Sequence, residues 1–260
     1  MKKLQYIFAI MATLLCAAGC VGQKDDPEED PIGKPGPDPV YDESEAGSCL
    51  VLEFTGTWCV NCPGMHAAIE SAMEQKPGVI VPVAVHCLSL DPLSTPLSDE
   101  LISRFGISAY PSVVVDFDPG TLFTAASPDL LLARCDQLRK ARGKAAALSI
   151  KEAWDGYDAI SIQVTATVAR DGDYTVHLLR LANGLMSPQT GASENYIHND
   201  VLQEWMDAPE TFPGLHAGDG IHTEFKVEAT MGTYKLVAVI CRDGIVDNVA
   251  ASGYGILLDE

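Results

Sequence analysis

Two cysteines three positions apart are the residues of this chain whose types and spacing point most clearly to a chemical reaction. Cys59 and Cys62 lie within Trp58–Pro63, whose sequence is WCVNCP. At the start of a helix this spacing places both side chains on one side of a turn, close enough for a disulfide. Backbone N–H groups and the helix dipole favour a thiolate there. The spacing predicts thiol–disulfide exchange, in which Cys59 attacks and Cys62 displaces the mixed disulfide.

A metal site is the alternative for the same residues, because half of a zinc site has this spacing. His66 follows Cys62 by four residues, so Cys59, Cys62 and His66 could share a helix face. A fourth ligand is not evident, although Cys87 would lie at the same end of a parallel sheet. We therefore expect no metal, with His66 on the helix surface or in packing and Cys87 as a buried or spare thiol.

The segments that must position the cysteine pair alternate between strand and helix composition. We expect strands over residues 49–54, 79–85, 112–116 and 121–124, and helices over 67–75, 98–105 and 128–142. The order β, α, β, α, Pro, β, β, α resembles the core of thioredoxins. The resemblance implies an α/β thioredoxin-like domain over residues 48–146.

Three further positions take roles that the thioredoxin resemblance implies. Glu53 ends the first strand, where thioredoxins place a buried acid that accepts the proton of the resolving thiol. Pro111 follows Tyr110 before a strand and matches the cis-proline loop of the family, which faces the cysteine pair and binds substrate backbone. Trp58 is expected to shield one side of the pair. The alternatives are a solvent-facing Glu53 and a trans Pro111, the commoner isomer in general.

Beyond residue 147 the hydrophobic period changes to two. Residues 160–168, 174–181 and 223–229 alternate, 233–241 is apolar throughout, and 148–154 and 254–258 are further candidate strands. Asp243–Gly244 has the composition of a hairpin turn. This pattern predicts an all-β, immunoglobulin-like sandwich over residues 147–260.

Three histidines and one long stretch stand out in this second half. The stretch 183–220 interrupts the predicted strands, and we expect long loops of this kind to bind or position a partner. His198, His216 and His222 follow no compact ligand spacing. We therefore expect them in solvated loops or structural roles, although a metal or catalytic cluster is conceivable.

Residues 1–47 have the composition of export and attachment segments. Lys2 and Lys3 precede an uncharged stretch over residues 4–18, which is shorter than the ~20 residues that span a bilayer. We expect a lipoprotein signal peptide over residues 1–19 and lipid attachment at Cys20; the alternative is cleavage after Ala18. Residues 20–47 are rich in acidic residues, Pro and Gly, which predicts an extended tether.

The charge balance excludes one class of partner. The chain has 36 acidic and 17 basic side chains, a formal net charge of −19. A nucleic-acid binder needs a basic surface that displaces phosphate counterions, so no nucleic-acid partner is expected. Anionic lipid head groups are disfavoured as electrostatic partners for the same reason, which leaves the N-terminal lipid as the membrane contact.

The whole layout resembles the Omp28-related outer-membrane lipoproteins of the Bacteroidetes. The resemblance runs through Glu53–Pro63 and Ala109–Pro111, and more loosely through Tyr196–Asp200 and the strand after Thr233. It implies an outer-membrane lipoprotein on the periplasmic or surface-exposed face. We expect an envelope thiol–disulfide oxidoreductase acting on protein thiols or disulfides, with no cofactor beyond the redox-active Cys59–Cys62 pair. The alternative is a cell-surface binding protein or adhesin on a thioredoxin-like scaffold.

Overall fold

The computed structural model describes residues 42–154, 159–208, 210–228, 232–253 and 255–257. The expected signal peptide, the lipid site Cys20 and the tether up to residue 41 lie outside the described residues. Among the described residues, no helix is both long and apolar enough to cross a bilayer.

The first half of the described chain is a mixed sheet with three helices. Its elements are β1 (Cys49–Thr55), α1 (Cys62–Gln75), β2 (Ile80–His86), α2 (Pro96–Phe105), β3 (Ser112–Val115), β4 (Asp118–Phe123) and α3 (Pro128–Arg142). The strands lie in the order β2-β1-β3-β4, with β1 parallel to β2 and antiparallel to β3. All seven residues of β1 are buried, as a central strand with covered faces requires.

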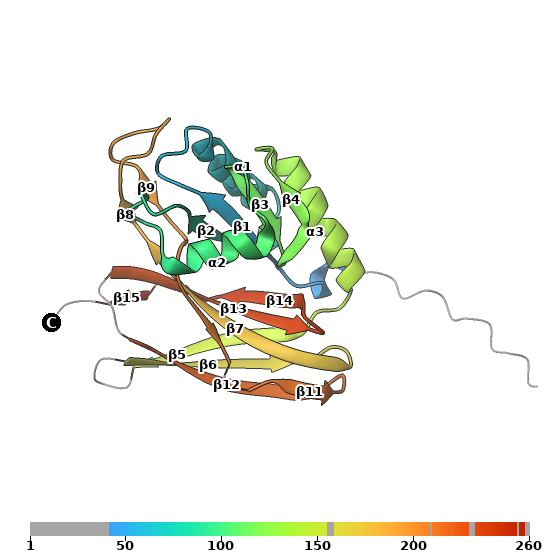
Figure 1. The fold of residues 1–260 in the computed structure, drawn as a ribbon. Helices are drawn as coiled ribbons and strands as arrows, with labels where there is room; N and C mark the ends of the chain where they lie inside the picture. The colour runs from blue at the N-terminus through green and yellow to red at the C-terminus, as the bar shows by residue number, and fades with distance from the viewer. Residues whose placement is uncertain (1–41, 155–158, 209, 229–231, 254, 258–260) are drawn as a thin grey trace, which may run out of the picture. The chain divides into compact units, whose positions relative to one another are not determined.

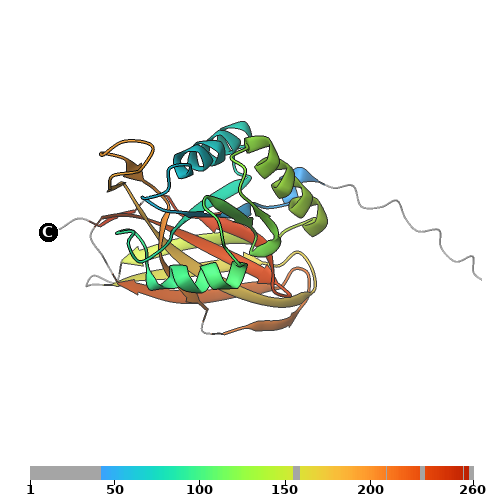
Figure 2. The same cartoon turned by 45° about the horizontal axis from the view of Figure 1, so that its top comes forward.

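The helices cover both faces of this sheet. α1 and α3 pack on one face through Met65, Ile69 and Leu131, and α2 packs on the other through Leu101 and Phe105. Figure 2 shows α2 on the opposite side of the sheet from α1 and α3. Proline stands in the first turn of each helix, where its missing N–H costs no hydrogen bond.

The second half is built from strands. They are β5 (Ala147–Trp154), β6 (Ala159–Thr167), β7 (Gly172–Asn183), β8 (Leu185–Met186), β9 (Ile197–His198), β10 (Val201–Asp207), β11 (Phe212–Leu215), β12 (Gly220–Glu228), β13 (Gly232–Arg242), β14 (Ile245–Ala251) and β15 (Gly255–Leu257). The strands β5, β6 and β12 form one sheet, and their buried residues alternate with exposed or half-buried ones in β6 and β12. Figure 1 shows this sheet as a separate layer beneath β7, β13 and β14.

One continuous sheet joins the two halves. Its order is β14-β13-β7-β10-β2-β1-β3-β4, and the junction is the parallel pairing of Val201 in β10 with Ala84 in β2. β13 is buried on both faces: Leu236 and Ile240 face the β5–β6–β12 layer, whereas Val237 packs with the α2 side of the first half. Because both faces of β13 are buried, its sequence is a continuous apolar run and does not alternate.

The sequence missed several elements of the stretch 183–220. It predicts no strand there, yet β8, β9, β10 and β11 form within it, and β14 follows the predicted hairpin turn. Most of these strands are short, and β10 depends on pairing with β7 and β2. Such strands depend on distant partners more than on local propensity, so their composition does not reveal them.

Residues 42–47, which the sequence places in the tether, are folded. Glu43–Glu45 form a turn of 3-10 helix and Ala46 is buried. Arg139 on α3 holds the segment, because its Nε donates to the Gly47 carbonyl at 2.8 Å and its Nη2 to the Glu43 carbonyl at 2.7 Å.

Candidate functional site

The cysteine pair lies where β1 passes into α1. Cys59 and Cys62 form a disulfide with 5.4 Å between their Cα atoms, and α1 begins at Cys62 with Pro63 in its first turn. The backbone N–H of Cys59 donates to the Gly56 carbonyl at 3.0 Å, which closes the connecting turn. Both cysteines are buried, whereas Trp58 and Val60 beside them are exposed. The disulfide therefore sits just below the surface at the N-terminus of a helix.

Trp58 connects this turn to the loop before β3. Its indole N–H donates to the Cys87 carbonyl at 3.1 Å, and its ring meets Tyr110 edge-on at 5.1 Å between centroids. The Tyr110–Pro111 peptide bond is cis, as the sequence predicts. The contact between Trp58 and Tyr110 places the loop of Pro111 beside the disulfide turn. Gly56 is required here, because a Cβ on it would lie 2.5 Å from the Trp58 indole nitrogen.

Glu53 is buried in β1 and has few partners. Its side chain is 4% exposed, so the solvent-facing alternative is wrong. Its Oε2 lies 3.5 Å from Nδ1 of His66, and its Oε1 has no hydrogen-bond partner within the described part of the chain. Leaving a buried carboxylate oxygen without a partner is costly, so one oxygen of this carboxyl group is open to a further hydrogen-bond donor.

His66 joins the buried acid to the surface. Its other ring nitrogen, Nε2, lies 3.5 Å from Glu70, one turn further along α1, whose side chain is 63% exposed. The Glu53 carboxylate raises the pKa of His66, although burial opposes the shift. Cys62, His66 and Glu70 are spaced by four residues and so share one face of α1. His66 is a partner of Glu53, which is more than the packing role the sequence predicts.

A small cavity of about 20 Å³ lies behind the disulfide, with room for about one water molecule. Its wall contains Glu53, Cys62 and His66 from the first half, and Tyr196 and His198 from the segment around β8 and β9. His198 is therefore a buried residue of this site and does not lie in a solvated loop, whereas His216 and His222 are exposed. Burial lowers the pKa of His198.

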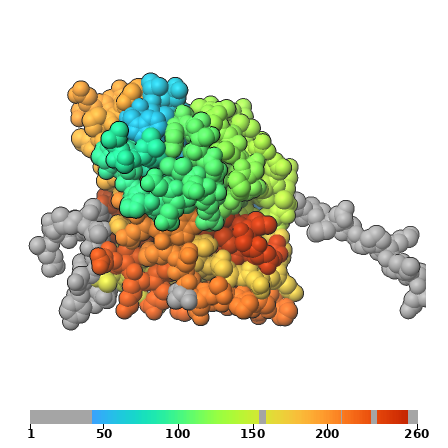
Figure 3. Space-filling model, in the orientation of Figure 1, coloured from blue at the N-terminus to red at the C-terminus, as the bar shows by residue number. Residues whose placement is uncertain are grey.

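The segment from β8 to β9 clamps the disulfide turn. Gln189 is buried, and its side-chain amide donates to the carbonyls of Cys59 at 2.9 Å and Gly56 at 3.2 Å. The N–H of Thr190 donates to the Thr57 carbonyl at 2.8 Å. Figure 3 shows the orange atoms of this segment against the blue atoms of the disulfide segment. Nothing in the sequence around Gln189 predicts this contact.

A buried ion pair supports the other side of the turn. His86 at the end of β2 lies 2.9 Å from Asp91, and the same carboxylate oxygen of Asp91 accepts the N–H of Thr57 at 2.7 Å. Burial by itself would raise the pKa of Asp91, but the hydrogen bonds from His86 and two backbone N–H groups hold it below its usual value. The His86 ring packs edge-on against His198 at 5.0 Å.

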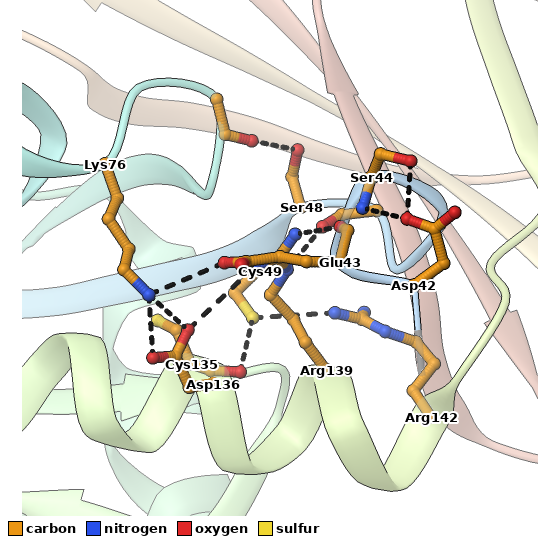
Figure 4. Close-up of polar contacts among 12 residues, drawn as sticks. Asp42, Glu43, Ser44, Ser48, Cys49, Lys76, Cys135, Asp136, Arg139 and Arg142 are labelled. Carbon is orange, nitrogen blue, oxygen red and sulfur yellow. Dashed lines mark hydrogen bonds and ion pairs between the residues drawn. The ribbon is translucent and has the colours of Figure 1, made fainter. Parts of the chain in front are cut away.

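The remaining described cysteines are buried free thiols. Figure 4 shows the Cys49 sulfur between Cys135 and Arg142, whose Nη2 donates to it at 3.5 Å. The Cys135 side chain and burial raise the pKa of Cys49 far above its usual range. Burial raises the pKa of Cys87 and of Cys241 to about 12. Within the described ranges, no three metal-binding side chains come together as a ligand set.

The fold and the site together define a disulfide-bearing protein in which an α/β half and a β-rich half share one sheet. No protein-family model matches the chain, and no curated protein matches it. Two solved structures are similar. HBP35 of Porphyromonas gingivalis has a TM-score of 0.61 and 18% identity, over 79% of this chain and 74% of that one. Protein AGR_C_4864 of Agrobacterium tumefaciens has a TM-score of 0.58 and 17% identity, over 80% of this chain and 94% of that one. At these identities the likeness concerns the fold alone.

Proposed function

We propose that this protein is a thiol–disulfide oxidoreductase of the bacterial cell envelope. The observation that carries the proposal is the Cys59–Cys62 disulfide at the N-terminus of α1, with the partner-poor carboxyl group of Glu53 in the cavity behind it. The helix N-terminus stabilises a thiolate on the attacking cysteine, and the buried carboxylate can accept a proton from the resolving one. In this proposal the first half is a thioredoxin-like domain and the second an immunoglobulin-like sandwich.

The reaction uses the two protein sulfurs, the Glu53 carboxylate as proton acceptor, and the substrate. In the reduced protein the Cys59 thiolate attacks a substrate disulfide, which forms a mixed disulfide and releases one substrate thiolate. Cys62 then gives its proton to Glu53, and its thiolate attacks the Cys59 sulfur, so the second substrate thiolate leaves. Two electrons pass to the substrate and the Cys59–Cys62 disulfide remains. The reverse sequence oxidises a substrate dithiol.

The surface beside the disulfide and the N-terminal sequence support a substrate class and a cellular location for this reaction. The exposed Trp58 and the loop of Pro111 form a surface beside the disulfide where an extended protein segment can bind. The substrates are therefore protein thiols or disulfides of the envelope. With lipid on Cys20, the chain is an outer-membrane lipoprotein related to the Omp28 group.

The test is turnover of a disulfide-bonded peptide by the purified protein that begins at residue 20. We expect Cys59→Ser to abolish turnover, because it removes the attacking thiolate. Cys241→Ala is the matched control, since this buried thiol lies far along the sequence in β13, and it should retain activity. Unchanged turnover in Cys59→Ser would exclude the proposal.

A surface binding protein is the second candidate, and the clamp by Gln189 favours it. Cys59 is 5% exposed, and a segment of the second half covers its turn. A disulfide with a purely structural role has a reduction potential below about −300 mV, whereas catalytic cysteine pairs have potentials above that value. The measured potential of the Cys59–Cys62 pair therefore separates the two functions.

A further inference from the structure

A second and larger cavity lies away from the disulfide. It has a volume of about 470 Å³, within the ~300–1,000 Å³ range of small-molecule sites. It lies between α3, the turn from β3 to β4, and the hairpin of β13 and β14. Part of its wall is apolar, with Pro119 on one side, Leu138 and Ala141 on α3, and Ile245 at the start of β14. Ile245 is 68% exposed, an apolar side chain left at the surface.

Three arginines from three different segments line the same cavity. Arg142 from α3 lies 3.5 Å from the carboxylate of Asp116. Arg170 and Arg242 share the buried carboxylate of Asp247, at 2.8 and 3.8 Å. Three guanidinium groups therefore face two buried carboxylates, and Asp118 is the third acidic group of the wall.

The remaining acidic groups near the cavity lie in solvent. Asp118 in the wall is exposed, and Asp243, which lies 3.3 Å from Arg242, is 53% exposed. Water screens exposed charges far more than buried ones, so these two carboxylates offset the charge of the arginines only weakly.

The arginines also keep unused hydrogen-bonding capacity. The Nε–H groups of Arg142, Arg170 and Arg242 are buried and have no hydrogen-bond partner among the described residues. The Nε of Arg242 still faces Asp247 at 3.8 Å, whereas Arg142 and Arg170 meet their carboxylates through Nη atoms. Buried donors of folded proteins are nearly always paired, so these guanidinium groups have incomplete partners.

Asp116 lies in the two-residue hairpin turn between β3 and β4, which requires positive φ at both central residues. Asp116 and Phe117 are consecutive residues with φ of 52° and 59°, in the left-handed region that side chains other than glycine disfavour. The turn directs the Asp116 carboxylate inward, where it accepts the N–H of Leu50 at 2.8 Å and meets Arg142.

We propose that this cavity binds a small monocarboxylate with an apolar body. The ligand's carboxylate pairs with Arg170 and Arg242, which share the single buried carboxylate of Asp247. The ligand's apolar body packs on Pro119, Leu138 and Ile245. The site is separate from the Cys59–Cys62 disulfide and does not depend on the proposed redox function.

The test uses three six-carbon probes in calorimetric titrations of the protein that begins at residue 20. Hexanoate carries the carboxylate, hexanol has the same apolar body without charge, and hexylamine has the opposite charge. We expect saturable binding of hexanoate, binding of hexanol at least about tenfold weaker, and none of hexylamine, because a hydrogen bond to a charged group contributes ~1.5–3 kcal/mol. Equal binding of hexanoate and hexanol, or no saturable binding of hexanoate, would overturn the proposal.

Variants place the binding in this cavity. Arg242→Gln should weaken hexanoate binding at least about tenfold. The matched control is Arg134→Gln, since Arg134 also has a buried, unpartnered Nε but lies outside the cavity wall. Ala141→Phe keeps every charge and fills the cavity from α3, so it should abolish binding even if Arg242→Gln is poorly folded. Hexanoate binding that survives Ala141→Phe in a folded protein would show that it binds elsewhere.

Discussion

Two cysteine neighbourhoods lie at opposite ends of β1, and they differ in almost every chemical respect. At the start of the strand, Cys49 is a free thiol packed against Cys135 and Arg142. Beyond the end of the strand, Cys59 and Cys62 form a disulfide at a helix N-terminus. Both neighbourhoods are buried, so burial does not make the difference.

The carboxyl groups beside these cysteines differ in the same way. Asp116, near Cys49, accepts the N–H of Leu50 and pairs with Arg142. Glu53, near Cys62, has one distant histidine partner and an unpartnered oxygen. Breaking the pairing of a buried carboxylate costs stability, so Asp116 has more pairing to lose than Glu53. Among the described residues, the same residue types are thus more fully paired at the start of β1 than beyond its end.

The largest expected effect is on thiol reactivity. In the reduced protein at pH 7, Cys59 should react with iodoacetamide at least about 10³-fold faster than Cys49, because only a thiolate attacks and the raised pKa of Cys49 suppresses it. Peptide mass spectrometry over a time course measures both rates. In denaturant the two rates should converge, and equal rates in the folded protein would remove the contrast between the two ends.

The next effect concerns the two carboxylates. Arg142→Met leaves Asp116 buried without its charged partner and should lower the free energy of unfolding by ~3–5 kcal/mol. Glu53→Gln is the matched change at the other end, and it should cost less than about 1 kcal/mol because Glu53 has little pairing to lose. Denaturant titration measures both values. A larger loss in Glu53→Gln would contradict the comparison.

Asp116 should also make stability depend on pH. Burial raises its pKa to about 6 from 3.8, with Arg142 opposing the shift. The folded state then holds this proton between pH 3.8 and about 6 while the unfolded state has lost it, so the contribution to stability is lost as the pH rises through about 6. Asp116→Asn should remove this decline from unfolding free energies measured across that range.

A smaller effect is expected at the clamp, the contact of Gln189 with the carbonyls of the disulfide turn. Gln189→Ala leaves the carbonyls of Gly56 and Cys59 without this donor and should cost ~1–3 kcal/mol of stability. It should also speed reduction of the disulfide by dithiothreitol several-fold, because the turn is less covered. Gln203→Ala is the control, since Gln203 bonds only carbonyls within two residues of itself. A reduction rate that stays the same would show that the clamp does not restrict access.

The smallest effect is expected at His66. Glu53 raises its pKa above the usual 6.5, so the ion pair stabilises the fold below pH 6.5 and is lost as the pH rises through the raised value. His66→Gln should flatten this loss, which amounts to less than about 1 kcal/mol for a partly exposed pair. A pH profile that His66→Gln leaves unchanged would contradict this pairing.

The sequence predicted much of the first half. The strand over 49–54, the helix over 128–142 and the cis bond at Pro111 agree with β1, α3 and the observed isomer. The strand and the helix follow from local signals, because apolar run length, proline placement and cap residues act within a few positions. The cis bond is what the resemblance to thioredoxins implies. The expected helix over 67–75 begins earlier, at Cys62, because Pro63 starts the helix.

The sequence by itself determined the spacing of the residues that could do chemistry, with two cysteines at helix spacing and an acid six residues before the first, and it predicted alternating strands beyond residue 147. The tertiary structure decided which of them meet. Gln189 reaches Cys59 across 130 positions, and Arg142 and Arg242 line one cavity from separate halves. Such contacts depend on strand pairing between distant segments, such as Val201 with Ala84, and no local period encodes it.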